Sequence, residues 1–551
     1  MDLRLALSDL WTSFSFVGLA TATVFFALSV TPSLLPRPAL VQGLLSGFSL
    51  AIGYGLGVLF VWVWLWLELK RPSPALQWWS KRLTSVGVAI VFVTFVWRST
   101  VWQNSIRELV GLDPIQTADP ILFVSVAIGL GLVLVLLVRR LIALGGWLAS
   151  QLSPILPRRL SRLIGGVTVV MLTILVANGV IARGLLAAAD QFFSGADALT
   201  DAGIAMPTES NATGSLDSLI NWESIGRRGK QFLVDGPDAD SITDITGRPA
   251  KQPIRVYAGM RSGDDVDQRA ALALAELKRV GGFDRSVLVV ATPTGTGWLD
   301  PGGVDTIEVL HDGDTAIVST QYSYLPSWIT ILVEPSEAKR SAAALFDAVY
   351  EHWKTLSPKT RPRLVLFGLS LGAFGGEMAA DLLTTFEDPI DGAVWAGTPF
   401  PSTRWKQIVA DRNEDSPAWL PTFRDSRMVR FTNQTNHLET GTAWGPIRNV
   451  YVQYASDPMV WFSPSLAWKR PDWLTGTRGP DVSEFLQWVP IVTFLQIAFD
   501  LPLATSVPIG HGHNYNASSY IDAWFAVTQP DHWDAESMVR LKSVFAAKED
   551  L

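Results

Sequence analysis

The sequence predicts a chain of two parts, an N-terminal bundle of about five transmembrane helices and a following α/β domain built on a mainly parallel sheet. Long apolar runs crowd into the first third of the chain, whereas from Trp222 onward short β-branched runs alternate with helical segments. Charged residues make up 17% of the chain, below the roughly 25% typical of soluble domains. We therefore divide the 551 residues into a transmembrane helical domain (1–186), a linker (187–220) and an α/β domain (221–551).

Five apolar runs predict the membrane-spanning helices. A bilayer core of about 30 Å requires ~20 mostly apolar residues in helical conformation. The runs cover Phe14–Leu34, Leu44–Leu67, Leu83–Thr100, Ile121–Val138 and Leu163–Ile181. The third run is short and meets Arg98. Because the spans contain few ionisable residues, which a transport path would need, we interpret the bundle as an anchor in the cell membrane.

Lysine and arginine are concentrated in two of the loops between these spans. The loop after the second span carries Lys70, Arg71, Lys81 and Arg82, and the loop after the fourth carries Arg139, Arg140, Arg158, Arg159 and Arg162. The other loops carry only Arg37, or Arg98 and Arg107. Short loops rich in these residues favour the cytoplasmic side. A five-span chain with its N-terminus inside then places everything after Ile181 on the extracytoplasmic side.

The remainder of the chain reads as a linker followed by alternating strands and helices. The linker is rich in small and polar residues, with a short amphipathic helix expected around Gln191–Leu199. We expect strands at Ile254–Tyr257, Val287–Ala291, Thr315–Thr320, Leu364–Phe367, Ala393–Ala396 and Val450–Tyr454. Helices are expected at Asp264–Val280, Ser336–Thr355 and through Glu377–Thr385. Apolar strands separated by helices are typical of a parallel sheet covered on both faces, which binds ligands at the C-terminal ends of its strands.

The motif Gly368-Leu369-Ser370-Leu371-Gly372 carries the chemistry that this sheet suggests. It follows an expected strand directly and opens a helix. A nucleophile on a tight strand-to-helix turn needs neighbours without side chains, so that the strained turn fits and the serine oxygen is exposed. The alternative is a serine in an ordinary βα turn. We predict that Ser370 is a nucleophile.

A serine nucleophile needs a base and an acid that orients it, in the chain order Ser, acid, His for this motif. Asp457 comes just beyond the strand Val450–Tyr454, where the acid belongs, although a turn aspartate before Pro458 is the alternative. His511 and His513 lie in one late loop, and both remain candidates for the base. We prefer His513, because a glycine precedes it and a small polar residue and an aromatic residue follow it.

The oxyanion of such a reaction would be held by backbone N–H groups. One comes from Leu371, directly after the nucleophile, and the other from the glycine-rich loop Thr292–Trp298, where we choose Thr296. A phosphate-binding loop is the competing interpretation of Thr292–Trp298, but the loop lacks the Gly-Lys-Ser/Thr ending.

Composition excludes several other functions. The net charge of −7 argues against a nucleic-acid partner. The absence of cysteine removes disulfides, thiolate nucleophiles and cysteine metal sites. His511-Gly512-His513 could suggest a metal, but no third ligand cluster accompanies it. We expect neither a metal nor a cofactor.

The chain resembles the actinobacterial membrane-associated α/β-hydrolase family, which joins a multi-spanning N-terminal domain to a hydrolase domain. The segments that carry the resemblance are Pro253–Tyr257, Thr292–Trp298, Gln321–Trp328, Gly368–Gly376, Ser456–Pro458 and Gly510–Tyr515. The resemblance implies an α/β-hydrolase domain with a catalytic set of Ser370, Asp457 and either His513 or His511. It supplies no substrate.

The leading hypothesis is therefore a membrane-anchored serine hydrolase (an esterase, lipase or thioesterase) acting on an acylated lipid or cell-envelope component. An acyltransferase that uses the same acyl-enzyme is one alternative, since both reactions need the same residues. A membrane scaffold without catalytic activity is another, and the presence of Ser370, Asp457 and a histidine argues against it. Membrane lipids are the other expected partners.

Overall fold

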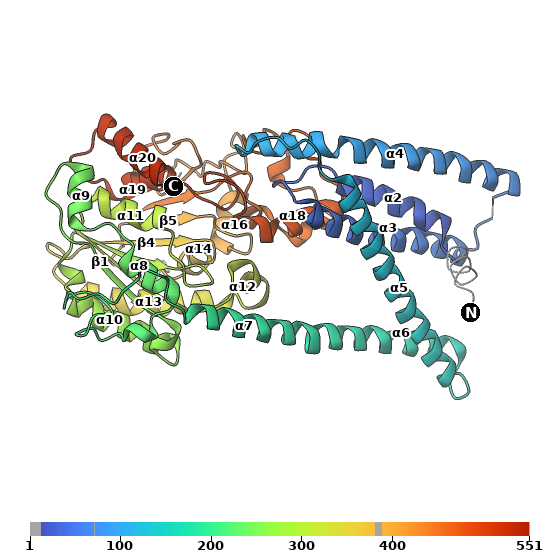
Figure 1. Cartoon of the computed structure of the whole chain (residues 1–551), viewed down its shortest axis with the longest axis horizontal. Coiled ribbons are helices and arrows are strands. Elements are labelled where there is room, and N and C mark those ends of the chain that lie inside the picture. Colours follow the sequence, from blue (N-terminus) through green and yellow to red (C-terminus); the bar gives the residue numbers. More distant parts are fainter. Residues whose placement is uncertain (1–12, 71, 381–387, 550–551) are drawn as a thin grey trace. The chain divides into compact units, whose positions relative to one another are not determined.

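The computed structural model describes residues 13–70, 72–380 and 388–549, which form two compact units (Figure 1). The first unit comprises Met1–Leu186, Phe462–Thr475 and Pro480–Leu503. The second comprises Ala187–Trp461, Gly476–Gly479 and Ala504–Leu551. Each unit is described by itself below.

Four helices of the described chain are long and apolar enough to cross a membrane. They are α3 (Ala39–Trp66), α4 (Pro74–Leu109), α5 (Pro120–Leu152) and the helical stretch Arg158–Asp197, which consists of α6 (Arg158–Ile174), the π-helical turn η1 (Leu175–Ala182) and α7 (Arg183–Asp197). The first expected span, Phe14–Leu34, contains only the 14-residue helix α2 (Phe16–Ser29), shorter than the ~20 residues that a bilayer core requires. The expected bundle of about five spans is confirmed in outline.

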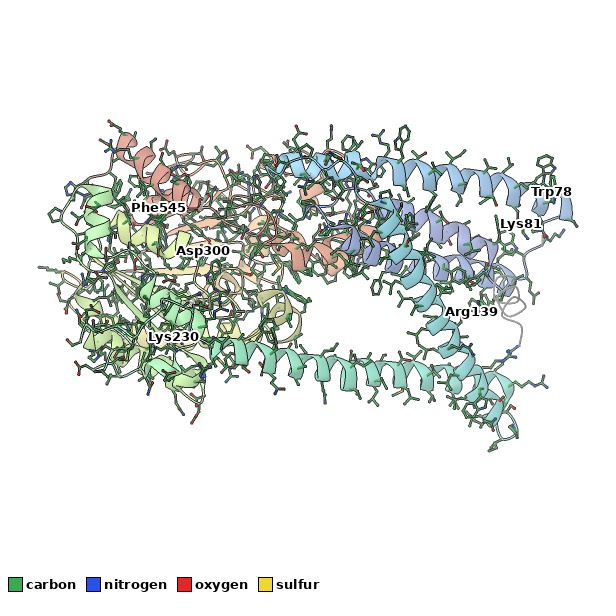
Figure 2. All side chains as sticks on the ribbon, viewed as in Figure 1. Trp78, Lys81, Arg139, Lys230, Asp300 and Phe545 are labelled. Carbon is green, nitrogen blue, oxygen red and sulfur yellow. The ribbon has the colours of Figure 1, made fainter. Side chains whose placement is uncertain are left out.

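The expected helix around Gln191–Leu199 is the end of α7. Parts of the two basic loops are also helical. Lys81 and Arg82 lie in the first turns of α4, and Arg139 and Arg140 lie within α5. Figure 2 shows Trp78 and Lys81 near the N-terminal end of α4. Hydropathy marks only the apolar middle of such a helix, whereas backbone hydrogen bonding continues into its polar ends.

The second unit contains a seven-stranded, wholly parallel sheet, which confirms the predicted class. Its order is β1-β3-β2-β4-β5-β7-β6. The strands are β1 (Ile254–Ala258), β2 (Val287–Thr292), β3 (Thr315–Thr320), β4 (Arg363–Leu369), β5 (Gly392–Ala396), β6 (Val429–Thr432) and β7 (Arg448–Val452). Every residue of β2 and β3 is buried, as expected of strands covered on both faces. The expected strand Val450–Tyr454 is β7, displaced by two residues, and β6 was not expected.

Helices cover the sheet and cap its ends. α10 (Val266–Arg279) packs beside α13 (Ser336–Thr355), and α11 (Pro301–Leu310) packs beside α19 (Ala517–Thr528) (Figure 1). Other α-helices that the structure describes in this unit are α8 (Arg227–Val234), α9 (Ala239–Thr246), α12 (Ser327–Val333), α14 (Leu371–Gly376), α16 (Thr403–Ala410), α17 (Pro458–Trp461) and α20 (Ala535–Glu549).

Of the helix expected through Glu377–Thr385, only the first four residues are described. α14 ends at Gly376, residues 377–379 form a turn, and residue 380 is a bend. Residues 381–385 lie outside the described residues.

The segment from Phe462 to Leu503 belongs largely to the first unit, although it comes late in the chain. Its helix α18 (Val492–Asp500) packs against α2 and α3. Asp500 accepts a hydrogen bond from Leu34 N (3.1 Å) and lies 3.8 Å from the Arg37 guanidinium. Gln496 donates to the carbonyl of Thr31 at 2.8 Å. This late segment is therefore bound to the turn between α2 and α3.

Replacing Arg37 by alanine is expected to destabilise the first unit and to loosen α18. The Arg37 and Asp500 side chains are both fully buried, and an unpaired buried carboxylate costs about 3–5 kcal/mol. Hydrogen exchange at Val492–Asp500 and the unfolding midpoint in detergent would measure the effect. The double variant Arg37→Leu/Asp500→Leu should recover part of the loss. Unchanged exchange in Arg37→Ala would show that the pair does not hold the segment.

Candidate active site

Ser370 occupies the sharp turn between β4 and α14. Its backbone has φ 58° and ψ −124°, a conformation that costs a non-glycine residue about 1–3 kcal/mol and is concentrated at functional sites. The Ser370 N–H donates to Ala396 O at the end of β5 (2.9 Å). The residue is 1% exposed, and its hydroxyl makes no hydrogen bond within the described part of the chain. The turn therefore presents a serine hydroxyl that has no hydrogen-bond partner among the described residues.

The two glycines of the motif are required by close backbone contacts. A Cβ at Gly368 would lie 2.4 Å from the carbonyl carbon of Gly372. A Cβ at Gly372 would lie 2.1 Å from Thr292 O, at the end of the neighbouring strand β2. Side chains at either position would push α14 away from the sheet, so the motif is needed for the tight turn itself.

Asp457 lies in the turn that follows β7 and is fully buried. Its Oδ1 accepts a hydrogen bond from the Met459 N–H (2.8 Å). Its Oδ2 accepts one from the Tyr515 hydroxyl (2.8 Å) and lies 2.6 Å from Nδ1 of His513. A buried carboxylate is stable only when such donors surround it. These hydrogen bonds hold the Asp457 carboxylate in place, and its Oδ2 orients the imidazole of His513.

His513 is the histidine that the structure places against Asp457. Because the carboxylate can only accept, Nδ1 of His513 carries a proton and donates, which leaves Nε2 as the acceptor in the neutral ring. Nε2 is buried and has no hydrogen-bond partner among the described residues. His511, two residues earlier, is half-buried, and its backbone N–H donates to Pro508 O.

Ser370 and His513 both contact the end of β5. The Ser370 N–H is bound to Ala396 O, and the His513 ring lies against the next residue, Gly397. A Cβ at Gly397 would be 2.5 Å from Cε1 of His513, and Gly397 has φ 52°. A glycine is therefore required here for the imidazole to lie close to the serine turn.

Leu371, the first predicted oxyanion residue, is buried and begins α14. The first N–H groups of a helix have no partner within the helix. The hydrogen bond that begins α14 runs from the Phe374 N–H to Ser370 O. The N–H of Leu371 is therefore oriented by the helix start.

Thr296, the second predicted oxyanion residue, lies in the loop after β2. This loop is held rigidly: Tyr257 donates to Gly297 O (2.7 Å) and Tyr322 to Pro293 O (3.1 Å). The N–H groups of Thr294, Gly295 and Gly297 are all used in hydrogen bonds. Within the described residues the Thr296 N–H makes no hydrogen bond, so it is available to a ligand; the Trp298 N–H is likewise without a partner there.

Tyr515 and Ser456 also support the site, although the sequence pattern predicted no role for either residue. Tyr515 donates to Asp457, and burial, followed by the charge of Asp457, raises the pKa of Tyr515 well above its usual value, so it stays a donor. Ser456 accepts a hydrogen bond from the Gly512 N–H (2.9 Å) and so joins the aspartate turn to the histidine loop. The aromatic residue two positions after His513 was the available signal for Tyr515. No local sequence pattern indicated a role for Ser456.

The described residues contain no group of three or more His, Asp or Glu side chains that could hold a metal ion. The arrangement of a serine on a strained turn, a histidine and a buried carboxylate is suited to nucleophilic acyl chemistry without a metal ligand set.

Two family models match the chain. The model described as "Alpha/beta-hydrolase family" matches residues 254–541, and the model described as "Alpha/beta-hydrolase family N-terminus" matches residues 30–237. The first match spans the sheet together with Ser370, Asp457 and His513. Searches of the curated proteins and of the solved structures found no match.

Proposed function

Because the chain belongs to the α/β-hydrolase family, with matches to both its hydrolase and N-terminal models, we propose that it is a membrane-anchored serine hydrolase. Membership of this family supports a hydrolase-type function. The observation that carries the serine mechanism is the 2.6 Å pair of His513 and Asp457, next to a serine held in a strained turn between β4 and α14.

In the proposed reaction Ser370 Oγ attacks the carbonyl carbon of an acyl ester or thioester. His513 Nε2 takes the serine proton, while its Nδ1–H remains bound to Asp457, whose charge stabilises the imidazolium. The N–H groups of Leu371 and Thr296 hold the oxyanion of the tetrahedral intermediate. The intermediate collapses when His513 returns the proton to the leaving alcohol or thiol, and an acyl-enzyme remains.

Water completes the cycle through the same residues. His513 takes a proton from water, the hydroxide attacks the acyl-enzyme, and the released serine oxygen is reprotonated. Every proton transfer uses Nε2, the ring atom that has no partner among the described residues.

An acylated lipid or cell-envelope component is the proposed substrate. The support is the N-terminal region, whose four long apolar helices are compatible with membrane association. A chain held at a bilayer meets lipids and lipid-linked molecules at high local concentration.

A serine-directed fluorophosphonate tests the proposal on the full-length protein. Intact-mass spectrometry should show one adduct on the wild type and none on Ser370→Ala. Ser341→Ala is a matched control, because Ser341 is also buried but bonds to Thr320 (3.1 Å); it should keep the adduct. An unmodified wild type, as a non-catalytic scaffold would give, or an adduct that survives Ser370→Ala, would refute the mechanism.

We further propose that the hydrolase unit faces away from the cytoplasm. Two long helices, α4 and α5, connect the basic region of residues 67–82 with the basic region of residues 139–162. Because two membrane crossings return the chain to the side where it started, both regions share one side whether or not α2 crosses the membrane. Their lysines and arginines favour the cytoplasm, which puts the end of Arg158–Asp197 on the other side.

Reporter fusions after Ala187 and within Lys70–Arg82 should therefore report opposite sides of the membrane. A fusion after Leu112, between α4 and α5, is the control and should agree with the fusion after Ala187. The same side for Ala187 and Lys70–Arg82 would contradict the orientation.

A further inference from the structure

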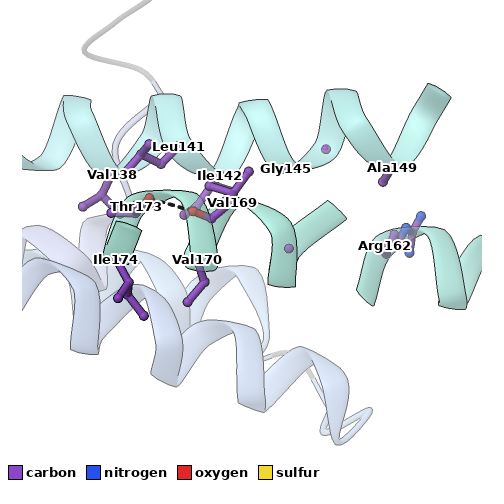
Figure 3. A pocket seen from close by; sticks show the side chains of 12 residues that line it. Val138, Leu141, Ile142, Gly145, Ala149, Arg162, Val169, Val170, Thr173 and Ile174 are labelled. Carbon is purple, nitrogen blue, oxygen red and sulfur yellow. Dashed lines mark hydrogen bonds between the residues drawn. The ribbon is translucent and has the colours of Figure 1, made fainter. Parts of the chain in front are cut away.

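An apolar groove of about 600 Å³ runs between α5 and α6 (Figure 3). The two helices are in close backbone contact at a pair of glycines, where a Cβ at Gly165 would lie 2.5 Å from Gly145 O. Beyond this contact side chains such as Val138 and Ile174 line the space between the helices. The volume is within the range of about 300–1,000 Å³ found for small-molecule sites.

The groove offers one charged group to a ligand. Its lining is apolar apart from Thr173 and Arg162. The Thr173 hydroxyl donates to Val169 O in its own helix (2.7 Å), so it is already satisfied. Arg162 lies near one end of the groove (Figure 3). A ligand that fills the groove would therefore be long and apolar, with its polar group at the Arg162 end.

The positive charge around the groove favours an anionic ligand. Between Pro120 and Ala189 the chain contains six arginines and no aspartate or glutamate. Arg162 is exposed and has neither a hydrogen bond nor an ion pair with any residue that the structure describes. A guanidinium binds phosphate through two parallel hydrogen bonds, and basic sites between membrane helices are suited to anionic lipid headgroups.

We propose that this groove binds an anionic phospholipid of the bilayer, with one acyl chain between α5 and α6 and the phosphate on Arg162. The site is distinct from the serine site and does not depend on the proposed hydrolysis. It requires that these helices lie in a membrane. The lipid would fill the space that the two helices leave open beside their glycine contact.

Native mass spectrometry of the full-length protein in a non-ionic detergent tests the site, with phosphatidylglycerol and phosphatidylcholine as probes. The wild type should bind one phosphatidylglycerol in preference to phosphatidylcholine. Arg162→Gln should weaken that binding about fivefold, the effect expected for one arginine near a lipid headgroup. Gly146→Leu and Gly166→Leu should abolish the binding, because the leucine side chains fill the groove.

The glycine variants have a close control. A Cβ at Gly146, Gly166 or Gly129 meets no atom within 4 Å, so the backbone has room for a side chain to start at each position. Gly129 lies on α5 but does not line the groove, and Gly129→Leu should bind as the wild type does. Arg183→Gln is the charge control and should also bind normally.

Three results would overturn the proposal. Equal binding of the two lipids would remove the anion preference. Equal weakening by Arg162→Gln and Arg183→Gln would indicate diffuse attraction to a basic surface. A protein dimer that Gly166→Leu dissociates, without selective lipid binding, would assign the groove to a second copy of the chain.

Discussion

Replacing Ser370 by alanine is expected to lower the turnover of a p-nitrophenyl ester by roughly three to six orders of magnitude. Alanine removes the nucleophile, whereas the oxyanion donors and the binding surface remain. The fold should survive, because the hydroxyl makes no hydrogen bond among the described residues and alanine keeps the Cβ that this turn already accommodates. The unfolding free energy should change by no more than about 0.5 kcal/mol.

The variant Ser370→Gly separates catalysis from stability. Glycine adopts φ 58° without strain, so this variant should be as inactive as Ser370→Ala but more stable by about 1 kcal/mol. Steady-state assays and denaturant unfolding on the three proteins would measure both effects. Turnover that remains within tenfold of the wild type in either variant would exclude Ser370 as the nucleophile.

Replacing His513 by alanine is expected to cause a loss of similar size, whereas His511→Ala should keep a measurable part of the turnover. His513 is the histidine bound to Asp457, at 2.6 Å. Without the imidazole, Ser370 has no base to accept its proton and remains a weak nucleophile at neutral pH. His511→Ala leaves the pair of His513 and Asp457 in place, so the base and the carboxylate that orients it both remain.

The two histidine variants control each other, because they change the same loop by the same substitution. Phosphonate labelling should slow in His513→Ala and proceed in His511→Ala. Loss of turnover only in His511→Ala would reverse the assignment of the base. Equal losses, together with a lowered unfolding midpoint in both, would mean that the loop rather than the imidazole had been tested.

The sheet and the serine turn were predictable because their signals are local. Runs such as Val287–Ala291 are apolar at every position, which is compatible with burial on both faces of a parallel sheet. Gly368 and Gly372 mark the turn for a steric reason that holds wherever this motif closes. β6 was missed because it is a four-residue edge strand with only one neighbour, β7, and so short a run has little periodicity to detect.

The position of the late segment Phe462–Leu503 depended on contacts that no local pattern encodes. Its apolar stretch Val492–Leu503 is short and could belong to any core. Among the contacts that tie it to the first unit is the burial of Asp500 beside Leu34 and Arg37, more than 450 residues away in the chain. The segment leaves the second unit just after Asp457 and returns shortly before His513, whose N–H is bound to Ala504 O (2.7 Å).

The sequence by itself determined that long apolar helices precede a parallel α/β domain, and that Ser370 lies on a strand-to-helix turn with Asp457 and two histidines after it. Only the tertiary structure decided which histidine meets the carboxylate. His511 and His513 are separated by a single glycine, and Gly510 and Gly512 both have positive φ. In such a turn the direction of each side chain is set by backbone conformations that residue type permits but does not fix. The contacts of Gly512 with Ser456 and of His513 with Gly397 fix them here.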